Sequence, residues 1–153
     1  MLVVDTNILL YAVDLDSPDH VPCRGLLEKW RKGSTPWYIT WGVVYEFLRV
    51  ATHPNVFRNP FPLADAWKFL DVLLASPSLS VLGESERHSQ IVSEVFQEIP
   101  DIRGNLVFDT HTAVLMRENG IRKICTRDTD FHHFPFVEII DPLREYQRIQ
   151  SAR

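Results

Sequence analysis

Residues 2–12 have the sequence LVVDTNILLYA, and this stretch decides the fold class. The apolar residues 2–4 predict a short buried strand, and Thr6 or Asn7 is a suitable N-cap for a helix that continues over residues 8–12. A strand that passes directly into a helix is typical of an α/β fold. Asp5 stands where the predicted strand ends.

The rest of the chain alternates between strands and helices in the same way. Further strands are expected at residues 37–40, 79–82, 121–126 and 137–140, and helices at residues 20–32, 42–52, 63–74, 84–99 and 106–119. Because no tight hairpin signal joins the strands, the pattern indicates a mostly parallel sheet covered by helices on both sides. The length of 153 residues suits one domain. Residues 144–153 are polar and are expected to fray as a tail or to hold an extra short helix.

Four acidic residues lie far apart in the sequence but at similar places in the predicted fold. Asp5 and Asp128 follow predicted strands, whereas Glu46 and Asp109 lie in predicted helices. Carboxylates at the ends of parallel strands converge at one edge of the sheet. Crowded carboxylates repel one another unless a cation neutralises them, so the pattern predicts a metal site.

Each of the four acids stands in a motif. These motifs are residues 3–9 (VVDTNIL), 46–49 (EFLR), 104–111 (GNLVFDTH) and 126–131 (TRDTDF). In this order they resemble the motifs of PIN-domain ribonucleases, and the segment 51–54 (ATHP) and the chain length are most similar to VapC-type toxins of toxin–antitoxin pairs. The resemblance departs from the family at His111, which two threonines flank, and at Asp130, a second acid in the last motif.

The resemblance implies a fold, an activity and partners. The fold would be a three-layer α/β/α domain over residues 1–143, with a central, mostly parallel sheet of four to five strands. The activity would be that of a Mg²⁺-dependent endoribonuclease, with Mn²⁺ as a substitute, which hydrolyses RNA through metal-activated water and leaves a 5′-phosphate and a 3′-hydroxyl. The protein would be a cytoplasmic toxin, would form a homodimer and would be inhibited by a cognate antitoxin.

The same resemblance assigns roles to individual residues. Asp5, Asp109 and Asp128 would be metal ligands, and Glu46 would reach the metal directly or hold a water. The residues expected to support these ligands are Thr6, Asn7, Thr126 and Asp130. Independently of the resemblance, four arginines are candidates for phosphate contacts, although each taken singly is better explained as a solvated basic residue: Arg49, Arg58, Arg103 and Arg127.

Composition is compatible with these expectations. The 20 acidic residues outnumber the 16 basic ones by four, so the four candidate ligands account for the whole excess, and overall charge does not decide for or against RNA. Cys23 and Cys125 form neither a disulfide framework nor a zinc motif. No histidine pair has the His-Glu-x-x-His spacing of zinc enzymes. No apolar run approaches the ~18 residues of a membrane helix, and no secretion signal is recognised.

Other interpretations stay open at this point. Asp5 taken alone is as well explained as a helix cap, and Asp128 as a turn residue. The alternative to an enzyme is a non-catalytic PIN-like module that binds RNA or protein. A phosphohydrolase of the haloacid dehalogenase type also has an Asp after its first strand, but it needs a second Asp two positions later, where this chain has Asn7.

Overall fold

A computed structural model of the protein describes residues 1–152. The five strands form one sheet in the order β3-β2-β1-β4-β5, and every neighbouring pair is parallel. The strands are β1 (Val3–Val4), β2 (Trp37–Thr40), β3 (Leu79–Leu82), β4 (Lys123–Cys125) and β5 (Glu138–Ile140). The helices are α1 (Thr6–Val13), α2 (His20–Lys32), α3 (Trp41–Ala51), α4 (Leu63–Leu74), α5 (His88–Glu98), α6 (Leu106–Glu118) and α7 (Pro142–Ser151), with a short 3-10 helix η1 (Thr129–His133). The predicted α/β fold with a parallel sheet is confirmed.

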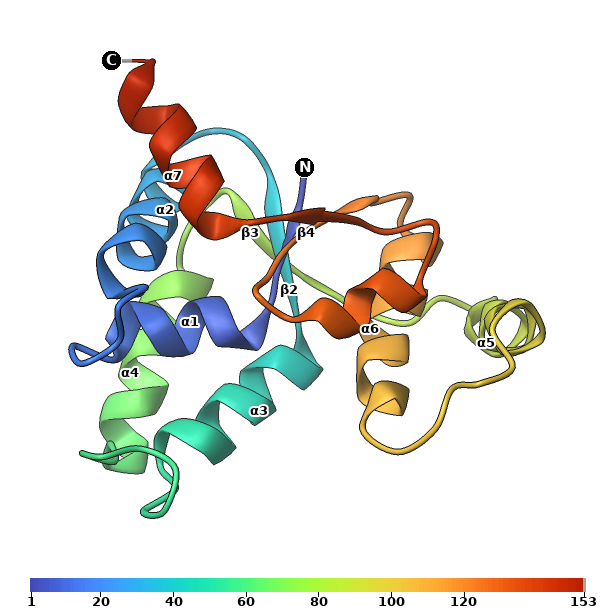
Figure 1. Ribbon diagram of the computed structural model, residues 1–153, viewed down its shortest axis with the longest axis horizontal. Coiled ribbons are helices and arrows are strands. Elements are labelled where there is room, and N and C mark those ends of the chain that lie inside the picture. Colours follow the sequence, from blue (N-terminus) through green and yellow to red (C-terminus); the bar gives the residue numbers. More distant parts are fainter. Residues whose placement is uncertain (153) are drawn as a thin grey trace.

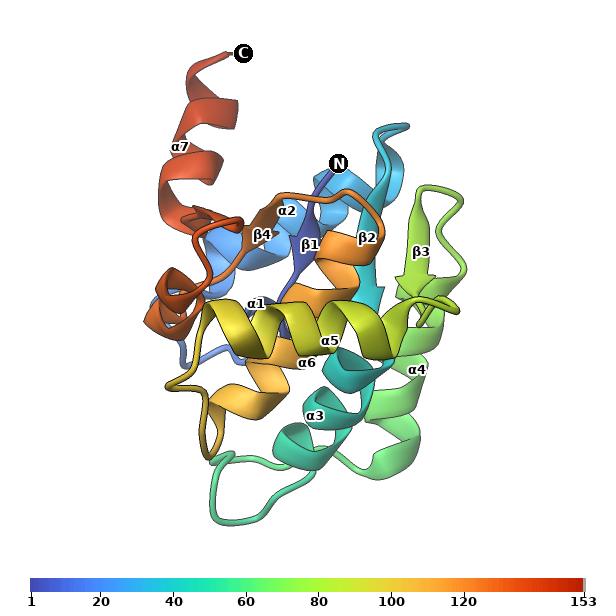
Figure 2. The same ribbon diagram turned by 90° about the vertical axis from the view of Figure 1, so that its right-hand side faces the viewer.

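Helices cover both faces of the sheet, so the molecule has three layers. Val4, Ile39 and Cys125 point to one face, where they pack against α1, α2, α3 and α4. Their neighbours in the strands, Val3 and Ile124, point to the other face and pack against α6 and η1, as the two-residue period of a strand requires. Figure 1 shows these two groups of helices on either side of the strands. In Figure 2, α5 lies across α6 as the outermost element of the second group.

The direction of the strands places the candidate site. Because all strands are parallel, their carboxyl ends meet at one edge. At this edge β1 leads into Asp5 and α1, β2 leads into α3, and β4 leads into η1. The acids of the first, second and fourth motifs therefore enter the same region from three adjacent strands.

The structure corrects some predicted boundaries. Asp5 rather than Thr6 or Asn7 is the N-cap of α1, and its Oδ1 accepts from the backbone N–H of Thr6 at 2.7 Å. Helix α5 begins at His88 and not at residue 84. Strand β4 is three residues long and shorter than expected.

The polar C-terminal segment forms a docked helix. Asp141 caps α7 by accepting from the backbone N–H groups of residues 143 and 144, and Ile149 is buried in the same core as α2. A Cβ added at Gly25 of α2 would lie 2.5 Å from the ring of Tyr146, so the absence of a side chain at Gly25 lets α7 pack closely. Of the two alternatives for residues 144–153, the structure has the helix. Arg153 lies outside the described residues.

No helix within residues 1–152 combines the length and the apolar character needed to cross a membrane.

Candidate active site

The carboxylate of Asp5 is held by a dense set of hydrogen bonds. Its Oδ2 accepts from the hydroxyl of Thr126 at 2.6 Å and from the side-chain amide of Asn7 at 2.9 Å. Only 8% of Asp5 is exposed. The Asp5 carboxylate accepts fewer hydrogen bonds than it would in water, but these bonds hold it in one orientation.

Thr126 connects two of the acidic motifs. Besides donating to Asp5, its hydroxyl oxygen accepts from the Asn7 amide and from the backbone N–H of Asp128, both at 2.9 Å. Asp128 in turn caps η1, since its Oδ1 accepts from the backbone N–H of Asp130 at 2.8 Å. One buried hydroxyl thus sets the relative positions of the first and fourth acids.

Glu46 reaches the site from α3. The hydroxyl of Thr6 donates to its Oε2 at 2.9 Å, and Arg49 lies 3.7 Å from its Oε1. Half of its side chain, 52%, is exposed. Glu46 is therefore anchored to the first motif while it keeps an oxygen accessible to solvent in the pocket.

Burial and repulsion disfavour the charge on Asp5. Loss of solvent raises the pKa of Asp5 to about 6, although the hydrogen bonds from Thr126 and Thr6 act in the opposite direction. The nearby carboxylates of Glu46 and Asp128 raise this pKa further. Asp5 is thus partly protonated near neutral pH unless positive charge is supplied.

Asp109 shows the same effect more strongly. Burial, followed by repulsion from Asp128 and Asp5, raises the pKa of Asp109 to about 7. Asp130 and Glu46 add smaller contributions, and no hydrogen bond from the described residues offsets them. The mutual repulsion shows that Asp109, on α6, shares one electrostatic environment with acids from β1, α3 and η1.

The acidic residues have the chemistry of a site for a hard divalent cation. Asp109, Asp128 and Asp130 each offer an oxygen, and these three oxygens lie within 4.8 Å of one another. The donors are all carboxylate oxygens, which hard divalent cations prefer to nitrogen or sulfur ligands. The residues present therefore fit Mg²⁺ or Mn²⁺.

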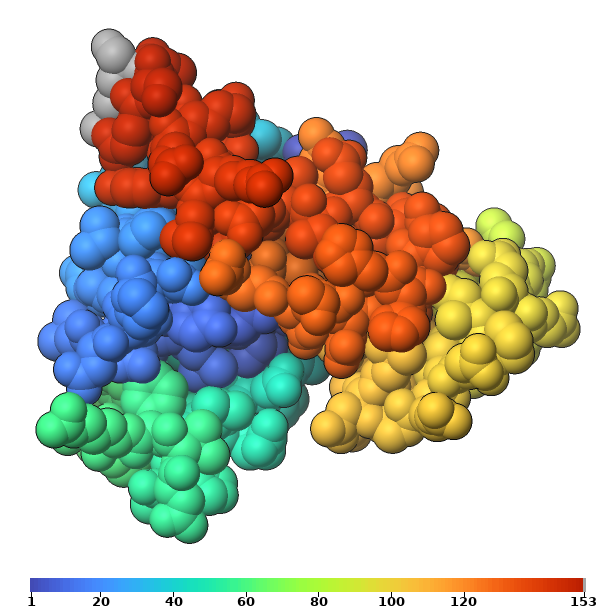
Figure 3. All heavy atoms as spheres, in the orientation of Figure 1, coloured from blue at the N-terminus to red at the C-terminus, as the bar shows by residue number. Residues whose placement is uncertain are grey.

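A pocket of about 350 Å³ opens beside these acids, between α3 and α6. Its lining residues are Asp5, Gly42, Val43, Tyr45, Glu46, Arg49, Phe108, Asp109, His111 and Thr112. Figure 3 shows a notch in this face, between the teal surface of α3 and the gold and orange surface of α6 and η1. Three of the four predicted acids line the pocket. The fourth, Asp128, is close enough to raise the pKa values of Asp5 and Asp109 by charge repulsion.

Comparison with known proteins identifies the family of the chain. The profile of the PIN domain family matches residues 2–137. The chain belongs to the PIN-domain family. Among its relatives, a VapC ribonuclease of Mycobacterium bovis is 37% identical over 78% of this chain and 81% of its own length. Ribonuclease VapC48 of Mycobacterium tuberculosis is 32% identical over 90% of this chain and 94% of its own length.

Solved PIN-domain structures have the same fold at lower identity. VapBC2 of Rickettsia felis, solved with a DNA fragment of its promoter, aligns with a TM-score of 0.65 and 19% identity over 91% of this chain and 96% of that chain. VapC20 of Mycobacterium tuberculosis, described as a toxin that cleaves the sarcin–ricin loop, has a TM-score of 0.63 and 17% identity over 92% and 100%. The resemblance drawn from the four motifs is therefore confirmed.

The positions of Asp130 and Arg127 in this PIN domain differ from the roles that were predicted for them from the sequence. Asp130 lies with Asp109 and Asp128 in one cluster of oxygen ligands, whereas the sequence indicated only a supporting role for it. Its position two residues after Asp128, at the start of a helical turn, is the signal that favours this convergence. Arg127 is bound to Asp19 at 3.3 Å and to Asp141 at 2.9 Å. It ties α2 to α7 and is a weaker candidate for phosphate than Arg49, which lines the pocket.

Replacing Thr126 with valine tests the role of the shared hydroxyl. The change keeps the shape of a side chain that is 1% exposed, but it removes the donor to Asp5 and leaves the Asp128 N–H without its acceptor. We expect unfolding free energy to fall by about 1–3 kcal/mol and Mg²⁺ affinity to fall by about 10- to 100-fold. Calorimetric titration and thermal melting measure both effects. Thr126→Ser keeps the hydroxyl and should retain most of the affinity, and equal losses in both variants would contradict this role.

Proposed function

We propose that this protein is a Mg²⁺-dependent endoribonuclease, with Mn²⁺ able to replace Mg²⁺, and that it acts as the toxin of a toxin–antitoxin pair. The observation that carries the proposal is the convergence of carboxylates from four separate elements on one pocket, where the pKa values of Asp5 and Asp109 rise to about 6 and about 7. The relatives that share the family over most of the chain are named as ribonucleases.

The carboxylates of Asp5, Asp109 and Asp128 would hold the ion, with Asp130 and Glu46 as further oxygen donors near it. When bound, the ion would activate water for attack on phosphorus and stabilise negative charge on the phosphoryl oxygens. Bringing a cation to these acids would also lower their pKa values and thereby keep them charged at neutral pH.

The other residues of the site orient this set of acids. The hydroxyl of Thr126 and the amide of Asn7 hold the Asp5 carboxylate in one orientation. The hydroxyl of Thr6 holds Oε2 of Glu46. Its Oε1 lies 3.7 Å from Arg49, and this oxygen of the half-exposed side chain would accept a hydrogen bond from the attacking water. No side-chain nucleophile is needed, because water itself attacks the phosphodiester.

The rim of the pocket suits single-stranded RNA. Tyr45 is 69% exposed and Phe108 is 77% exposed, and both line the pocket together with Arg49. Unpaired bases stack on aromatic rings, and Arg binds phosphate. We infer that the scissile strand passes between α3 and α6 with its bases against these rings.

Replacing Phe108 with alanine is expected to weaken RNA binding without disturbing the fold. Stacking of one base on an aromatic ring contributes about 1–3 kcal/mol, so the dissociation constant for a single-stranded RNA should rise roughly tenfold. Fluorescence anisotropy with a labelled oligoribonucleotide in Ca²⁺, which slows cleavage, measures the change. Phe96→Ala is the control, because Phe96 is an exposed aromatic residue on α5 outside the pocket. Equal effects of the two substitutions would refute the stacking site.

The activity itself is tested by incubating purified, antitoxin-free protein with total RNA in Mg²⁺, in Mn²⁺ and in EDTA. We expect discrete fragments in either metal ion and none in EDTA, with 5′-phosphate and 3′-hydroxyl ends on mapping. RNA that stays intact in all three conditions, with a folded protein that binds no Mg²⁺ in calorimetry, would favour the non-catalytic binding module instead.

The partners are part of the same proposal. Structures with this fold include a toxin–antitoxin complex from Klebsiella pneumoniae, at a TM-score of 0.58 and 15% identity. We propose a cognate antitoxin that covers the pocket, a homodimer, and action in the cytoplasm, where the RNA substrate is found. Co-expression with its antitoxin, once identified by co-purification, should suppress cleavage, and sedimentation should give the mass of two chains.

A further inference from the structure

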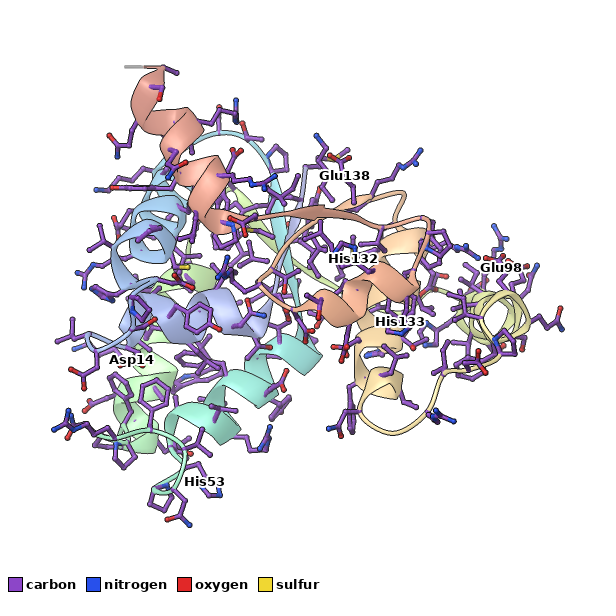
Figure 4. The ribbon with its side chains drawn as sticks, viewed as in Figure 1. Asp14, His53, Glu98, His132, His133 and Glu138 are labelled. Atoms are coloured by element: carbon purple, nitrogen blue, oxygen red, sulfur yellow. The ribbon has the colours of Figure 1, made fainter. Side chains whose placement is uncertain are left out.

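A second cluster of metal-binding residues lies outside the acidic site. Glu84 stands in the loop between β3 and α5, His88 is the first residue of α5, and His111 lies on α6. Each offers one ligand atom, and these atoms all lie within 4.8 Å of one another. The cluster contains imidazole nitrogens, unlike the all-carboxylate site beside it. Three other histidines do not belong to this cluster. Figure 4 shows His53 in the loop after α3 and His132 and His133 on η1, away from α5.

The three side chains already face one another. Nε2 of His111 lies 3.1 Å from Oε1 of Glu84, which is close to the spacing of two ligands on one tetrahedral zinc ion, about 3.3 Å. The rings of His88 and His111 meet edge to face, with centroids 5.6 Å apart and an angle of 83° between their planes. This arrangement needs only small rotations to direct a nitrogen of each ring to a common point.

His88 is oriented by a buried carboxylate. Its Nδ1 lies 2.7 Å from Oε2 of Glu118 on α6, and the Glu118 side chain is 1% exposed. The other oxygen of Glu118 accepts from the backbone N–H and the hydroxyl of Ser85. Because the Glu118 carboxylate lies against Nδ1 of His88, it favours the tautomer of His88 that carries its proton on Nδ1 and has a lone pair on Nε2.

A carboxylate that accepts the second N–H of an imidazole is the usual support of a metal-ligating histidine. We propose that His88 Nε2, His111 Nε2 and the Glu84 carboxylate bind one divalent transition-metal ion of the Zn²⁺ type, separately from the Mg²⁺ site. Two nitrogens and one oxygen match the preference of borderline ions, whereas Mg²⁺ prefers oxygen alone. Because the side chains of Glu84 and His111 are 56% and 39% exposed, water has access to the fourth position.

The position of this site gives the ion a structural role. Helix α5 packs chiefly on α6 and lies at the outside of the molecule. An ion held by Glu84, His88 and His111 would join the end of β3, the start of α5 and the middle of α6. His111 also lines the RNA-facing pocket and lies two residues after Asp109. The ion would thereby fix the α6 wall of the pocket.

The competing explanation is a closed polar bridge, in which His111–Glu84 and His88–Glu118 are ion pairs that need no metal. Titration of the metal-free full-length protein with ZnCl₂ by calorimetry separates the two, and Co²⁺ absorption reports the ligand geometry. We expect saturable Zn²⁺ binding, loss of one equivalent in His88→Gln and in Glu84→Gln, and retention of that equivalent in Asp109→Asn. His133→Gln is the matched histidine control and should bind as the unchanged protein does.

Glu118→Gln tests the supporting carboxylate and should weaken Zn²⁺ binding by about 10- to 100-fold, while thermal melting verifies that each variant is folded. If the unchanged protein binds no Zn²⁺, or if binding survives His88→Gln and is lost in Asp109→Asn, the site does not exist. Zn²⁺ binding and thermal melting do not depend on RNA cleavage. The zinc proposal can therefore fail while the nuclease proposal stands, and the nuclease proposal can fail while the zinc proposal stands.

Discussion

Asparagine in place of Asp5 should reduce RNA cleavage by at least about 100-fold. The substitution keeps the size of the side chain and its capacity to cap α1, but it removes one of the two negative charges at the strand ends. A metal ion supplies several kcal/mol of charge stabilisation in the transition state, and loss of about 3 kcal/mol corresponds to this factor. The effect should appear in the rate at saturating RNA, because the pocket rim that binds RNA is unchanged.

The measurement is single-turnover cleavage of one labelled RNA in Mg²⁺. The matched control is Asp101→Asn, which makes the same chemical change at an exposed turn residue outside the pocket and should cleave at the rate of the unchanged protein. Circular dichroism must show that the Asp5 variant is folded. A folded Asp5→Asn protein that cleaves at the normal rate would refute the nuclease site proposed for these acids.

The second large expected effect concerns stability: replacing one acid of the site should make the metal-free protein more stable. In the metal-free protein, Asp5 and Asp109 have folded-state pKa values of about 6 and about 7, above the ordinary value of 3.8. The folded state therefore binds more protons than the unfolded state between about pH 4 and pH 7, and stability must fall as pH rises through this window. After allowance for solvent at the half-buried Asp109, each of the two groups contributes a loss on the order of 2–3 kcal/mol.

Asp109→Asn should remove about half of this loss, because the contribution of the buried Asp5 remains. The variant has no charge to repel Asp128 and Asp5, and it gives up only a favourable interaction with the start of α6 of about 0.5 kcal/mol. We expect it to melt about 5 °C above the unchanged protein at pH 8 in EDTA and to melt at nearly the same temperature at pH 5. Mg²⁺ should raise the melting temperature of the unchanged protein but not that of the variant. A metal-free protein that becomes more stable from pH 5 to pH 8 would contradict this account.

The sequence predicted the elements well where side-chain periodicity decides them. The bounds of α2, β2, α4 and β3 agree with the expected ranges, because each has a clear apolar face and an end marked by Gly, Pro or Ser. Helix α5 begins four residues later than expected, since Glu84 and Ser85 are held to α6 through His111 and Glu118. That contact joins residues about 30 positions apart, and a local pattern does not reveal it.

The sequence was enough to propose the acidic residues of the candidate site, but not the hydrogen bonds that hold them in place. Strand ends and a parallel sheet were enough to place Asp5 and Asp128 together. The sequence did not indicate that a single hydroxyl, that of Thr126, contacts Asp5, Asn7 and the backbone of Asp128. It also did not indicate the cluster of Glu84, His88 and His111, because its ligands come from two helices and a loop with no fixed spacing.

The central position of β1 in the sheet determines how late in translation the acidic site can be completed. β1 is the middle strand, and its partners are residues near 38 and residues 124–125, so half of its pairing waits for the last part of the chain. Contacts between such distant positions form late in folding. A nascent chain that is still short of β4 has Asp5 but lacks Thr126 and Asp128. Products of termination before β4 should therefore lack the complete set of acids and be inert.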